Sequence, residues 1–440
     1  MNPDWRDSFR DKLVTADEAA RRVKDGDFVR FPMGPVPVTL LNALARRRDE
    51  LHGVRVLQGA TRHPHPWANG EPGWEEHIQF VTDFISVLVR PSIEARRGDF
   101  AVVDYGLGSK VLRGGRRDGF SADVFMAPVS QPDARGFVSF GYSLWHSKPL
   151  LRAAKLSIAE VGGKGLRTRG DNFIHLSEFD LLVEKQERQI ALTVPELTAE
   201  RQEVTEVIGA YVSTLINDGD TLQIGTGTLS SCMGSYLTEK HDLGIDSEIL
   251  VASAVELIKA GAVTGKYKTY HPGVTTASFI VPGADMDYCA DNPRIALYEI
   301  EWVNNLPRIS GIKNLVAINQ ASMIDLTGQV ASESIGSQMY TGPGGQLVWT
   351  MGALYSDGGR AIHVLPSTTR GGRVSRIVAQ LDPGTVVTVP RTFVDFVVTE
   401  HGITNLQGLT QRERALALIE IAHPDFREQL HAAARRLFWP

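Results

Sequence analysis

The sequence has few of the features that mark secreted or membrane-spanning proteins. Its 440 residues include only two cysteines, Cys232 and Cys289, whereas a secreted chain of this size usually carries more disulfides. The first residues alternate acidic and basic side chains, and no stretch of about 18 apolar residues occurs anywhere. We therefore expect a cytoplasmic protein with reduced thiols, no signal peptide and no membrane partner.

An excess of charge of one sign is also missing. Lys and Arg number 46 and Asp and Glu number 51, which gives a net charge of −5 without any long basic block. A surface that binds nucleic acid needs clustered Lys and Arg to neutralise phosphates, so we expect no nucleic acid partner. Two cysteines without further ligands at metal-binding spacing do not make a metal site, and we predict none.

Short apolar runs that alternate with helical patterns make up most of the chain. Hydrophobic residues account for 42% and charged residues for 22% of it, and at about 150 residues per domain its length suggests two to three domains. The alternation predicts an α/β fold with largely parallel, buried strands. The predicted strands are 54–58, 101–104, 124–128, 156–161 and 181–184 in the first half and 222–224, 249–251, 315–319, 362–366 and 386–389 in the second.

An internal repeat, offset by 193 residues, relates the two halves. Residues 25–29 (DGDFV) correspond to residues 218–222 (DGDTL), and Gly34 corresponds to Gly227. Both copies predict a helix, an Asp-Gly-Asp turn, a strand, a glycine loop and a second helix. We therefore expect two related open α/β domains, 1–194 and 195–440, that arose by duplication, with mostly parallel sheets and the active site in the cleft between them.

A predicted strand in the second half runs into Gly225-Thr226-Gly227, and Glu248 follows about 20 residues later. A dinucleotide-binding fingerprint has this outline, but its acidic residue ends the second strand, whereas Glu248 precedes the predicted strand 249–251. The pattern therefore argues against a nicotinamide site. The backbone amides of Gly225 and Gly227, at the start of a helix, still suit an anionic or carbonyl oxygen.

A second glycine cluster, residues 340–346 (YTGPGGQ), has two interpretations. The simpler one is an ordinary turn. The other is a loop stripped of side chains so that a ligand lies against main-chain amides, which a thioester carbonyl needs when its oxygen becomes negative. Glu248, taken alone, reads as a solvated carboxylate where a strand begins. The residues by themselves leave these alternatives open.

These motifs, in this order along nearly the whole chain, resemble the acetyl-CoA hydrolase/transferase family, the class I CoA-transferases typified by 4-hydroxybutyrate CoA-transferase. The matching stretches are 14–19 (VTADEA), 129–133 (VSQPD), 170–178 (GDNFIHLSE), 241–245 (HDLGI), 325–330 (DLTGQV), 334–336 (SIG), 340–346, 365–368 (LPST), 375–378 (SRIV), 398–403 (VTEHGI) and 421–427 (IAHPDFR).

The resemblance implies an acyl-CoA:carboxylate CoA-transferase that forms a homo-oligomer, a dimer or a tetramer. It places the catalytic nucleophile at Glu248, which would form an acyl anhydride and then a glutamyl-CoA thioester. Coenzyme A is then a substrate, and no cofactor is permanently bound. The partners are acyl-CoA and small carboxylic acids. Further residues implied in CoA binding, oxyanion stabilisation or substrate positioning are Gly342, Gly344, Gly345, Gln346, Gly225, Gly227 and Asn304.

Two other functions stay open beside CoA transfer. An acyl-CoA hydrolase would use the same glutamate, because water destroys the anhydride or the thioester if it enters the site. A non-catalytic CoA-binding protein is a more distant alternative. The resemblance also has departures, since Ala252-Ser253 stands where relatives commonly carry Asp-Gly. Together with five aromatic residues, Trp67, Trp74, Phe80, Phe84 and Tyr105, this predicts an acid that is bulkier or more apolar than acetate or 4-hydroxybutyrate.

Overall fold

The computed structural model describes residues 4–61, 63–108, 122–163, 166–189, 199–227 and 230–440. The chain divides into two compact units. Unit 1 consists of Met1–Val194, Ser278–Pro282 and Met286–Trp302, and unit 2 consists of Pro195–Ala277, Gly283–Asp285 and Val303–Pro440. The predicted domain boundary between residues 194 and 195 lies outside the described residues.

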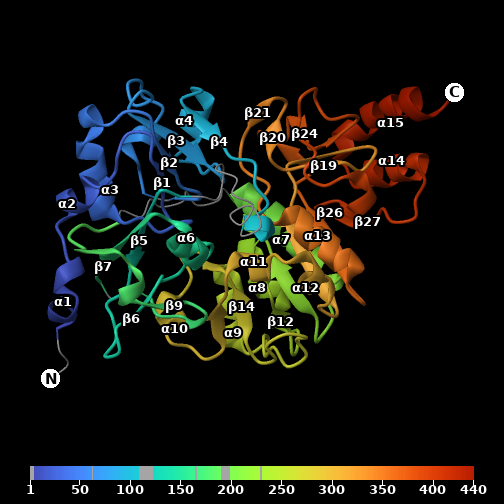
Figure 1. Ribbon diagram of the computed structural model, residues 1–440. Coiled ribbons are helices and arrows are strands. Elements are labelled where there is room, and N and C mark those ends of the chain that lie inside the picture. Colours follow the sequence, from blue (N-terminus) through green and yellow to red (C-terminus); the bar gives the residue numbers. More distant parts are fainter. Residues whose placement is uncertain (1–3, 62, 109–121, 164–165, 190–198, 228–229) are drawn as a thin grey trace. The chain divides into compact units, whose positions relative to one another are not determined.

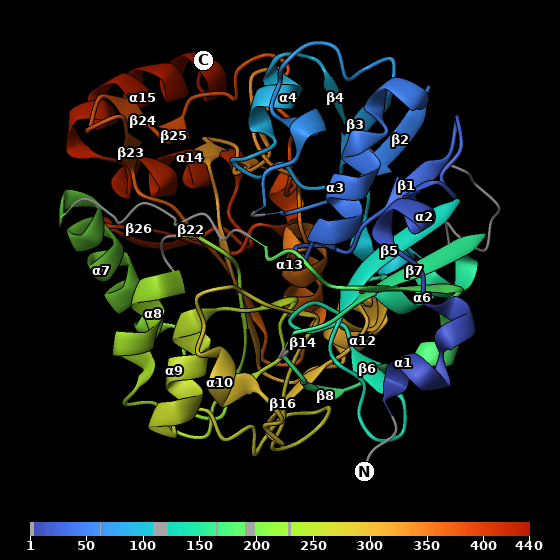
Figure 2. The ribbon, with the colours of Figure 1, turned by 90° about the vertical axis from the view of Figure 1, so that its left-hand side faces the viewer.

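Unit 1 is built on a seven-stranded sheet in the order β10-β7-β5-β1-β2-β3-β4, and all neighbouring strands in it are parallel. The helices α2 (Ala16–Ala20) and α3 (Val38–Arg46) pack on each other next to this sheet (Figure 1, Figure 2). The strands are β1 (Phe28–Arg30), β2 (Val54–Leu57), β3 (Ile78–Thr82), β4 (Gly98–Phe100), β5 (Val124–Val129), β7 (Leu156–Val161) and β10 (Leu181–Glu184).

Unit 2 is built on a six-stranded sheet in the order β12-β11-β17-β22-β26-β27, which is parallel except for the pair β26 and β27. Three helices, α7 (Ala199–Thr214), α8 (Ser230–Leu237) and α9 (Ala252–Ala260), pack in succession (Figure 2). The strands are β11 (Thr221–Ile224), β12 (Gly244–Ile245), β17 (Leu315–Gln320), β22 (Arg360–Val364), β26 (Phe396–Thr399) and β27 (Gly402–Asn405). The predicted α/β fold with mostly parallel sheets in two domains is confirmed.

Shorter elements of unit 2 surround this sheet. A core of fully buried side chains, among them Ile324, Val397 and Leu418, joins the end of the sheet to helices α14 and α15. These elements are α12 (Leu306–Ser310), α13 (Gln346–Tyr355), α14 (Gln411–Glu420), α15 (Pro424–Phe438), β18 (Met323–Asp325), β19 (Val330–Ala331), β20 (Ser334–Ile335), β21 (Gln338–Met339) and β25 (Ile377–Val378).

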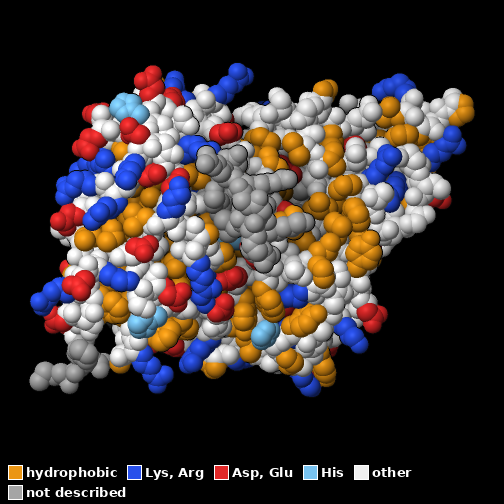
Figure 3. Space-filling model, in the orientation of Figure 1, with side chains coloured by type: hydrophobic (Ala, Val, Ile, Leu, Met, Phe, Trp, Pro, Cys, Tyr) orange, Lys and Arg blue, Asp and Glu red, His pale blue; other side chains and the backbone are white. Residues whose placement is uncertain are grey.

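Within the described ranges, no helix is both long and apolar enough to cross a membrane. On the face that Figure 3 shows, Lys and Arg side chains of unit 1 are interspersed with Asp and Glu side chains. This face therefore carries a mixture of both charges.

The sequence repeat corresponds to the same local structure in both units. In unit 1 the amide of His52 donates to Asp25 Oδ1 at 2.9 Å, and in unit 2 the amide of His241 donates to Asp218 Oδ1 at 2.8 Å. The glycines that follow the two aspartates have φ values of +76° and +80°. The strand order is also shared, because β10-β7-β5-β1-β2 in unit 1 matches β26-β22-β17-β11-β12 in unit 2.

Most predicted strands coincide with observed ones, and two do not. The strands 156–161 and 181–184 have the predicted bounds. The predicted strand 101–104 is wrong, because the edge strand β4 ends at Phe100. The predicted strand 386–389 is also wrong: Val386 and Val387 are 38% and 37% exposed in a segment between Pro383 and Pro390. The strand that joins the sheet there is β26, which the sequence analysis missed.

Candidate active site

The carboxyl edge of the unit 2 sheet carries most of the predicted site residues. In the sheet, β12 lies on one side of β11 and β17 lies on the other side. The chain therefore leaves β11 and β17 in opposite directions, and the loops that follow these two strands diverge. Ligands of α/β proteins bind in the crevice that such diverging loops leave. Gly225 and Gly227 follow β11, Gln320 ends β17, and Glu248 lies three residues after β12.

Glu248 is a buried carboxylate with a defined hydrogen-bond partner. Its exposed fraction is 7%, and Asn304 Nδ2 donates to its Oε2 at 2.6 Å. Trp349 Nε1, from helix α13, donates to Asn304 Oδ1 at 3.1 Å. Because an indole nitrogen is only a donor, this contact fixes the oxygen side of the Asn304 amide and turns its NH₂ group toward Glu248. The three side chains therefore form an oriented chain of hydrogen bonds.

The second glycine cluster lies directly against this carboxylate. Gly345 precedes helix α13 as its N-cap, and a Cβ atom added to it would overlap Glu248 Oε2 and lie 2.9 Å from Asn304 Nδ2. Gly344 has a φ of +57°, which favours glycine, and its added Cβ would lie 3.9 Å from Glu248 Oε1. The amino end of α13 is the positive end of its dipole and favours negative charge. The loop therefore leaves room for a buried carboxylate.

The first glycine pair, Gly225 and Gly227, lies against the amide side chains of Asn319 and Gln320. An added Cβ at Gly225 would lie 3.1 Å from Asn319 Oδ1, and one at Gly227 would overlap Gln320 Oε1. The backbone carbonyl of Gln320 accepts a hydrogen bond from Gln346 Nε2 at 3.5 Å. Gln320 thus links the loop after β11 to the first residue of α13. Gly342, also predicted for the site, is buried in the loop that leads to α13.

Comparison with known proteins decides the family. Residues 2–195 match the acetyl-CoA hydrolase/transferase N-terminal domain, and residues 284–434 match the acetyl-CoA hydrolase/transferase C-terminal domain. The chain belongs to the acetyl-CoA hydrolase/transferase family. The relationship predicted from the motifs is therefore confirmed.

Members of this family match the chain from end to end. The 4-hydroxybutyrate coenzyme A transferase of Clostridium kluyveri is 37% identical over 99% of this chain and 100% of its own. The succinyl-CoA:cyclohexane-1-carboxylate CoA transferase of Geobacter metallireducens is 36% identical over 98% and 97%. The crystal structure of RipA from Yersinia pestis has a TM-score of 0.87 and 31% identity, and the match covers 99% of both chains. The prediction that the chain is a CoA-transferase is confirmed by such full-length relatives.

The residues at which we predicted a departure from the family pattern, Ala252 and Ser253, lie at a contact between helices. Ala252 and Ser253 form the first turn of α9. Ser253 is buried, and its Cβ would be 3.4 Å from a Cβ added to Gly234 of α8. Of these two residues, Ala252 is therefore exposed and Ser253 fills a helix interface.

Three of the five aromatic residues predicted to line an acid pocket are fully buried. Trp67, Phe80 and Tyr105 are 3%, 1% and 2% exposed, and the Tyr105 hydroxyl donates to the backbone carbonyl of Asp83 at 3.0 Å. These side chains belong to the core of unit 1. Trp74 and Phe84 are half-buried, so only these two keep the exposed surface that the prediction requires.

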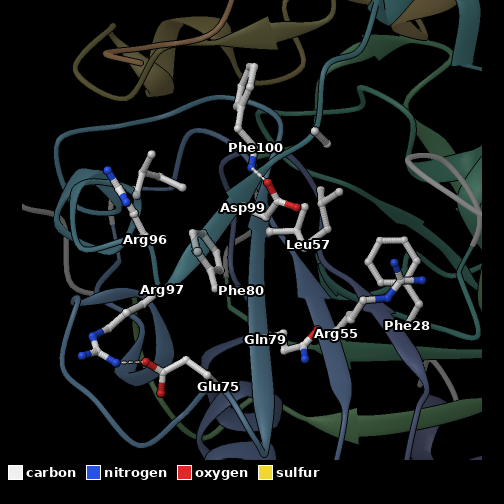
Figure 4. A pocket seen from close by; sticks show the side chains of 14 residues that line it. Phe28, Arg55, Leu57, Glu75, Gln79, Phe80, Arg96, Arg97, Asp99 and Phe100 are labelled. Atoms are coloured by element: carbon white, nitrogen blue, oxygen red, sulfur yellow. Dashed lines mark hydrogen bonds and ion pairs between the residues drawn. The ribbon is translucent and has the colours of Figure 1, made fainter. Parts of the chain in front are cut away.

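Unit 1 has a pocket of about 770 Å³ on its sheet. Phe80 lines this pocket, whereas Glu248, Asn304 and the glycines of the two loops do not. Figure 4 shows Arg55 next to Phe28 and the pair of Arg97 and Glu75 at the opposite side. The Arg55 guanidinium lies 4.7 Å from the Phe28 ring centre. The pocket walls therefore already use these charged groups in contacts with one another.

Trp349 and Gln320 are among the residues of this edge that the sequence analysis did not select. Trp349 lies one helical turn after Gly345, inside an apolar helix, and nothing in its sequence neighbourhood distinguishes it from a core residue. Gln320 differs, because a polar residue that ends a buried apolar strand is itself a signal. Among the described residues, no group of three or more His, Cys, Asp or Glu side chains has the arrangement of a metal site.

Proposed function

We propose that the chain transfers coenzyme A between an acyl-CoA and a carboxylic acid with Glu248 as the nucleophile. The observation that carries this proposal is the buried Glu248 carboxylate, which accepts a hydrogen bond from Asn304 at 2.6 Å and lies against Gly345. A carboxylate that is withdrawn from water and held in one orientation meets the geometric requirement for nucleophilic catalysis. The charged group also lies at the amino end of α13, where negative charge is favoured.

The reaction proceeds by exchange of acyl bonds and needs no oxidant or ATP. The Glu248 carboxylate attacks the thioester carbonyl, the C–S bond breaks, and coenzyme A leaves as a thiolate while a mixed anhydride forms. The thiolate then attacks the Glu248 carbonyl, which releases the first acid and leaves a glutamyl-CoA thioester. A second carboxylate attacks this thioester, and the same two steps in reverse give the new acyl-CoA and regenerate Glu248.

Asn304 and the glycine loop have separate roles in these steps. Asn304 binds Oε2, so we assign the attack to Oε1, the oxygen nearer to Gly344. Backbone amides of the 342–345 loop would stabilise the oxyanion that forms at each tetrahedral carbon, and Gln346 would hold the loop in place through Gln320. Gly225 and Gly227 would provide a surface without side chains for the same substrate.

The substrates are an acyl-CoA and a short carboxylic acid, whose identity differs among relatives of similar identity. The relatives at 37% and 36% identity are named for 4-hydroxybutyrate and for cyclohexane-1-carboxylate. The preference for a bulkier or more apolar acid stays a prediction, with Trp74 and Phe84 as its remaining support. The assembly into a dimer or tetramer is likewise a prediction, which sedimentation analysis tests.

A covalent intermediate on Glu248 tests the mechanism. Incubation with an acyl-CoA should add the mass of coenzyme A to the peptide that contains Glu248, and borohydride should cleave this thioester and abolish activity. Glu248→Ala should lower kcat by about 10³-fold or more at unchanged thermal stability. Glu256→Ala, an exposed glutamate on α9, is the matched control and should keep normal kinetics.

Three results would contradict the proposal. Normal transfer by Glu248→Ala, or coenzyme A mass on a different residue, would exclude Glu248 as the nucleophile. Release of coenzyme A at the same rate with and without an acceptor acid would identify a hydrolase that uses the same carboxylate.

A further inference from the structure

A second contact, deeper in unit 2, joins the two chain segments that meet at Glu248 and Asn304. Asp246 lies two residues before Glu248, and Arg308 lies four residues after Asn304. Arg308 Nη2 donates to Asp246 Oδ1 at 2.5 Å, and the two side chains are only 7% and 1% exposed. The segments are therefore connected twice, once through the nucleophile and once through a buried ion pair.

A third charged side chain completes this buried cluster. Lys268 Nζ lies 3.9 Å from Asp246 Oδ2 and donates to Ile245 O at 2.7 Å, Val274 O at 2.6 Å and Thr276 Oγ1 at 3.0 Å. Burial lowers the pKa of Lys268 to about 8. Lys268 thus holds the carbonyl that precedes Asp246, and the cluster fixes the backbone that leads to Glu248.

Both segments are also tied down locally. The amides of Asp246 and Ser247 donate to Leu222 O at 3.1 Å and Thr276 O at 3.0 Å. On the other segment, Asn305 caps helix α12 by accepting the Arg308 amide at 3.1 Å. The Arg308 side chain is therefore attached to a helix that starts immediately after Asn304, and a displacement of that helix would move the amide that binds Glu248.

Stability alone is a weak reason for such an ion pair. Removing two charges from water is costly, and apolar residues of similar volume often replace a buried pair with equal or greater stability. A buried ion pair more dependably holds one defined geometry, because displacement of one side chain would leave the charge of the other uncompensated. At a site where a displacement of about 1 Å costs about 10²-fold in rate, geometry is the relevant quantity.

We propose that Asp246 and Arg308 are positioning residues that hold Asn304 on Glu248, an inference that rests on the proposed role of Glu248 as nucleophile. Asp246 and Arg308 bond to each other, and each acts on the segment that bears its neighbour, Glu248 or Asn304. Loss of the pair loosens the Asn304 contact and slows attack, while the surfaces that bind acyl-CoA stay in place.

Single-turnover formation of the Glu248-CoA thioester, followed by mass spectrometry, tests this role. Asp246→Asn should slow the step by about 10- to 100-fold and change the KM for acyl-CoA by less than about threefold. Arg308→Lys, which keeps the positive charge, should recover part of the rate that Arg308→Met loses. If Asp246→Asn does not fold, the double variant Asp246→Leu/Arg308→Met replaces it, since a matched apolar pair is expected to fold.

A second ion pair in unit 2, between a buried aspartate and a partly buried arginine, provides the control. Arg360 Nη2 donates to Asp220, which is buried where β11 and β22 begin, at the opposite edge of the sheet. Asp220→Asn should lower thermal stability and leave the thioester step at its normal rate. A wild-type rate in Asp246→Asn or in the double variant, or an equal slowing by Asp220→Asn, would overturn the positioning role. Absence of the thioester in the unmodified enzyme would overturn both proposals, whereas its presence with unaffected variants would overturn only this one.

Discussion

The two units use one backbone framework but put their buried carboxylates on different strands of it. The amides of Arg55 and Gly244 donate to equivalent positions of the turns that precede β1 in unit 1 and β11 in unit 2. Arg55 and Gly244 are therefore equivalent residues, and so are Gly59 and Glu248, which lie four positions later. Unit 1 therefore has a glycine where unit 2 has the candidate nucleophile. A Cβ added at Gly59 would overlap Asp83 Oδ1, which shows that a carboxylate from the end of β3 occupies this space instead.

The partners of the two carboxylates differ in charge. Asp83 Oδ2 lies 4.0 Å from Arg30 Nη2, and both side chains are buried. Arg30 and Gln223 are the third residues of β1 and β11, so unit 2 has a neutral amide where unit 1 has a guanidinium. Glu248 accepts its 2.6 Å hydrogen bond from an amide as well. An amide orients a carboxylate without bringing an opposite charge, whereas a guanidinium also compensates its charge.

The largest expected effect contrasts the two glycines that face these carboxylates. Gly345 has φ −95° and ψ 10°, so Ala fits its backbone, but the added methyl group must displace Glu248. We expect Gly345→Ala to lower kcat by about 10²-fold or more at nearly unchanged stability. Gly59→Ala should instead lower the free energy of unfolding by about 1–3 kcal/mol, because its methyl group is forced into Asp83 and Met33.

Thermal unfolding and steady-state kinetics on the same two variants check this contrast. If Gly345→Ala transfers coenzyme A at the normal rate, the loop does not need to be bare next to Glu248. If Gly59→Ala is as stable as the unmodified protein, the space beside Asp83 is not tightly packed.

A second contrast concerns β7 in unit 1 and β22 in unit 2, which occupy equivalent places in the two sheets. Glu160 of β7 and Val364 of β22 are the fifth residues of equivalent strands, and both are buried. Burial raises the pKa of Glu160 to about 7, although the Leu40 amide, which donates to Oε2 at 3.2 Å, lowers it. Because the folded state holds this proton more tightly than the unfolded chain, unit 1 loses stability as pH rises from about 4.5 to about 7.

Glu160→Gln removes this titration and should stabilise the protein in one pH range only. At pH 8 we expect a gain of about 1–3 kcal/mol in the free energy of unfolding, from about 1.4 kcal/mol per pKa unit. At pH 4.5, where Glu160 is protonated in the folded state, the variant and the unmodified protein should be equally stable. Thermal unfolding across this range measures the difference, with the exposed Glu203→Gln as control; a gain that does not depend on pH would contradict the assignment.

Features that depend on residues close together in the sequence could be predicted, whereas features that depend on contacts between separate elements could not. Strands buried on both faces are continuous apolar runs, so 156–161 could be predicted from the sequence. The valines at 386–389 and the strand at 396–399 have similar local patterns, and only tertiary packing selects between them. Glu248 was identified through the family motif, because a single glutamate has no local signature. Asp83 and Trp349 could not be assigned, since each reaches its partner from a separate element.

The smallest expected effect tests whether the repeated turns are equivalent in energy as well as in geometry. Asp25 and Asp218 each accept a backbone amide, at 2.9 Å from His52 and at 2.8 Å from His241. We expect Asp25→Ala and Asp218→Ala each to cost about 0.5–1.5 kcal/mol at pH 8, and the double variant to show the sum, because the two aspartates share no partner. Only unit 2 adds a contact between side chains, since His241 Nδ1 lies 3.4 Å from Asp218 Oδ2. Both side chains of this contact are largely exposed, so it should add little to the cost of Asp218→Ala. Denaturant titrations at pH 8 measure the three variants, and clearly unequal costs of the two single variants would show that the turns are alike in shape but not in their contribution to stability.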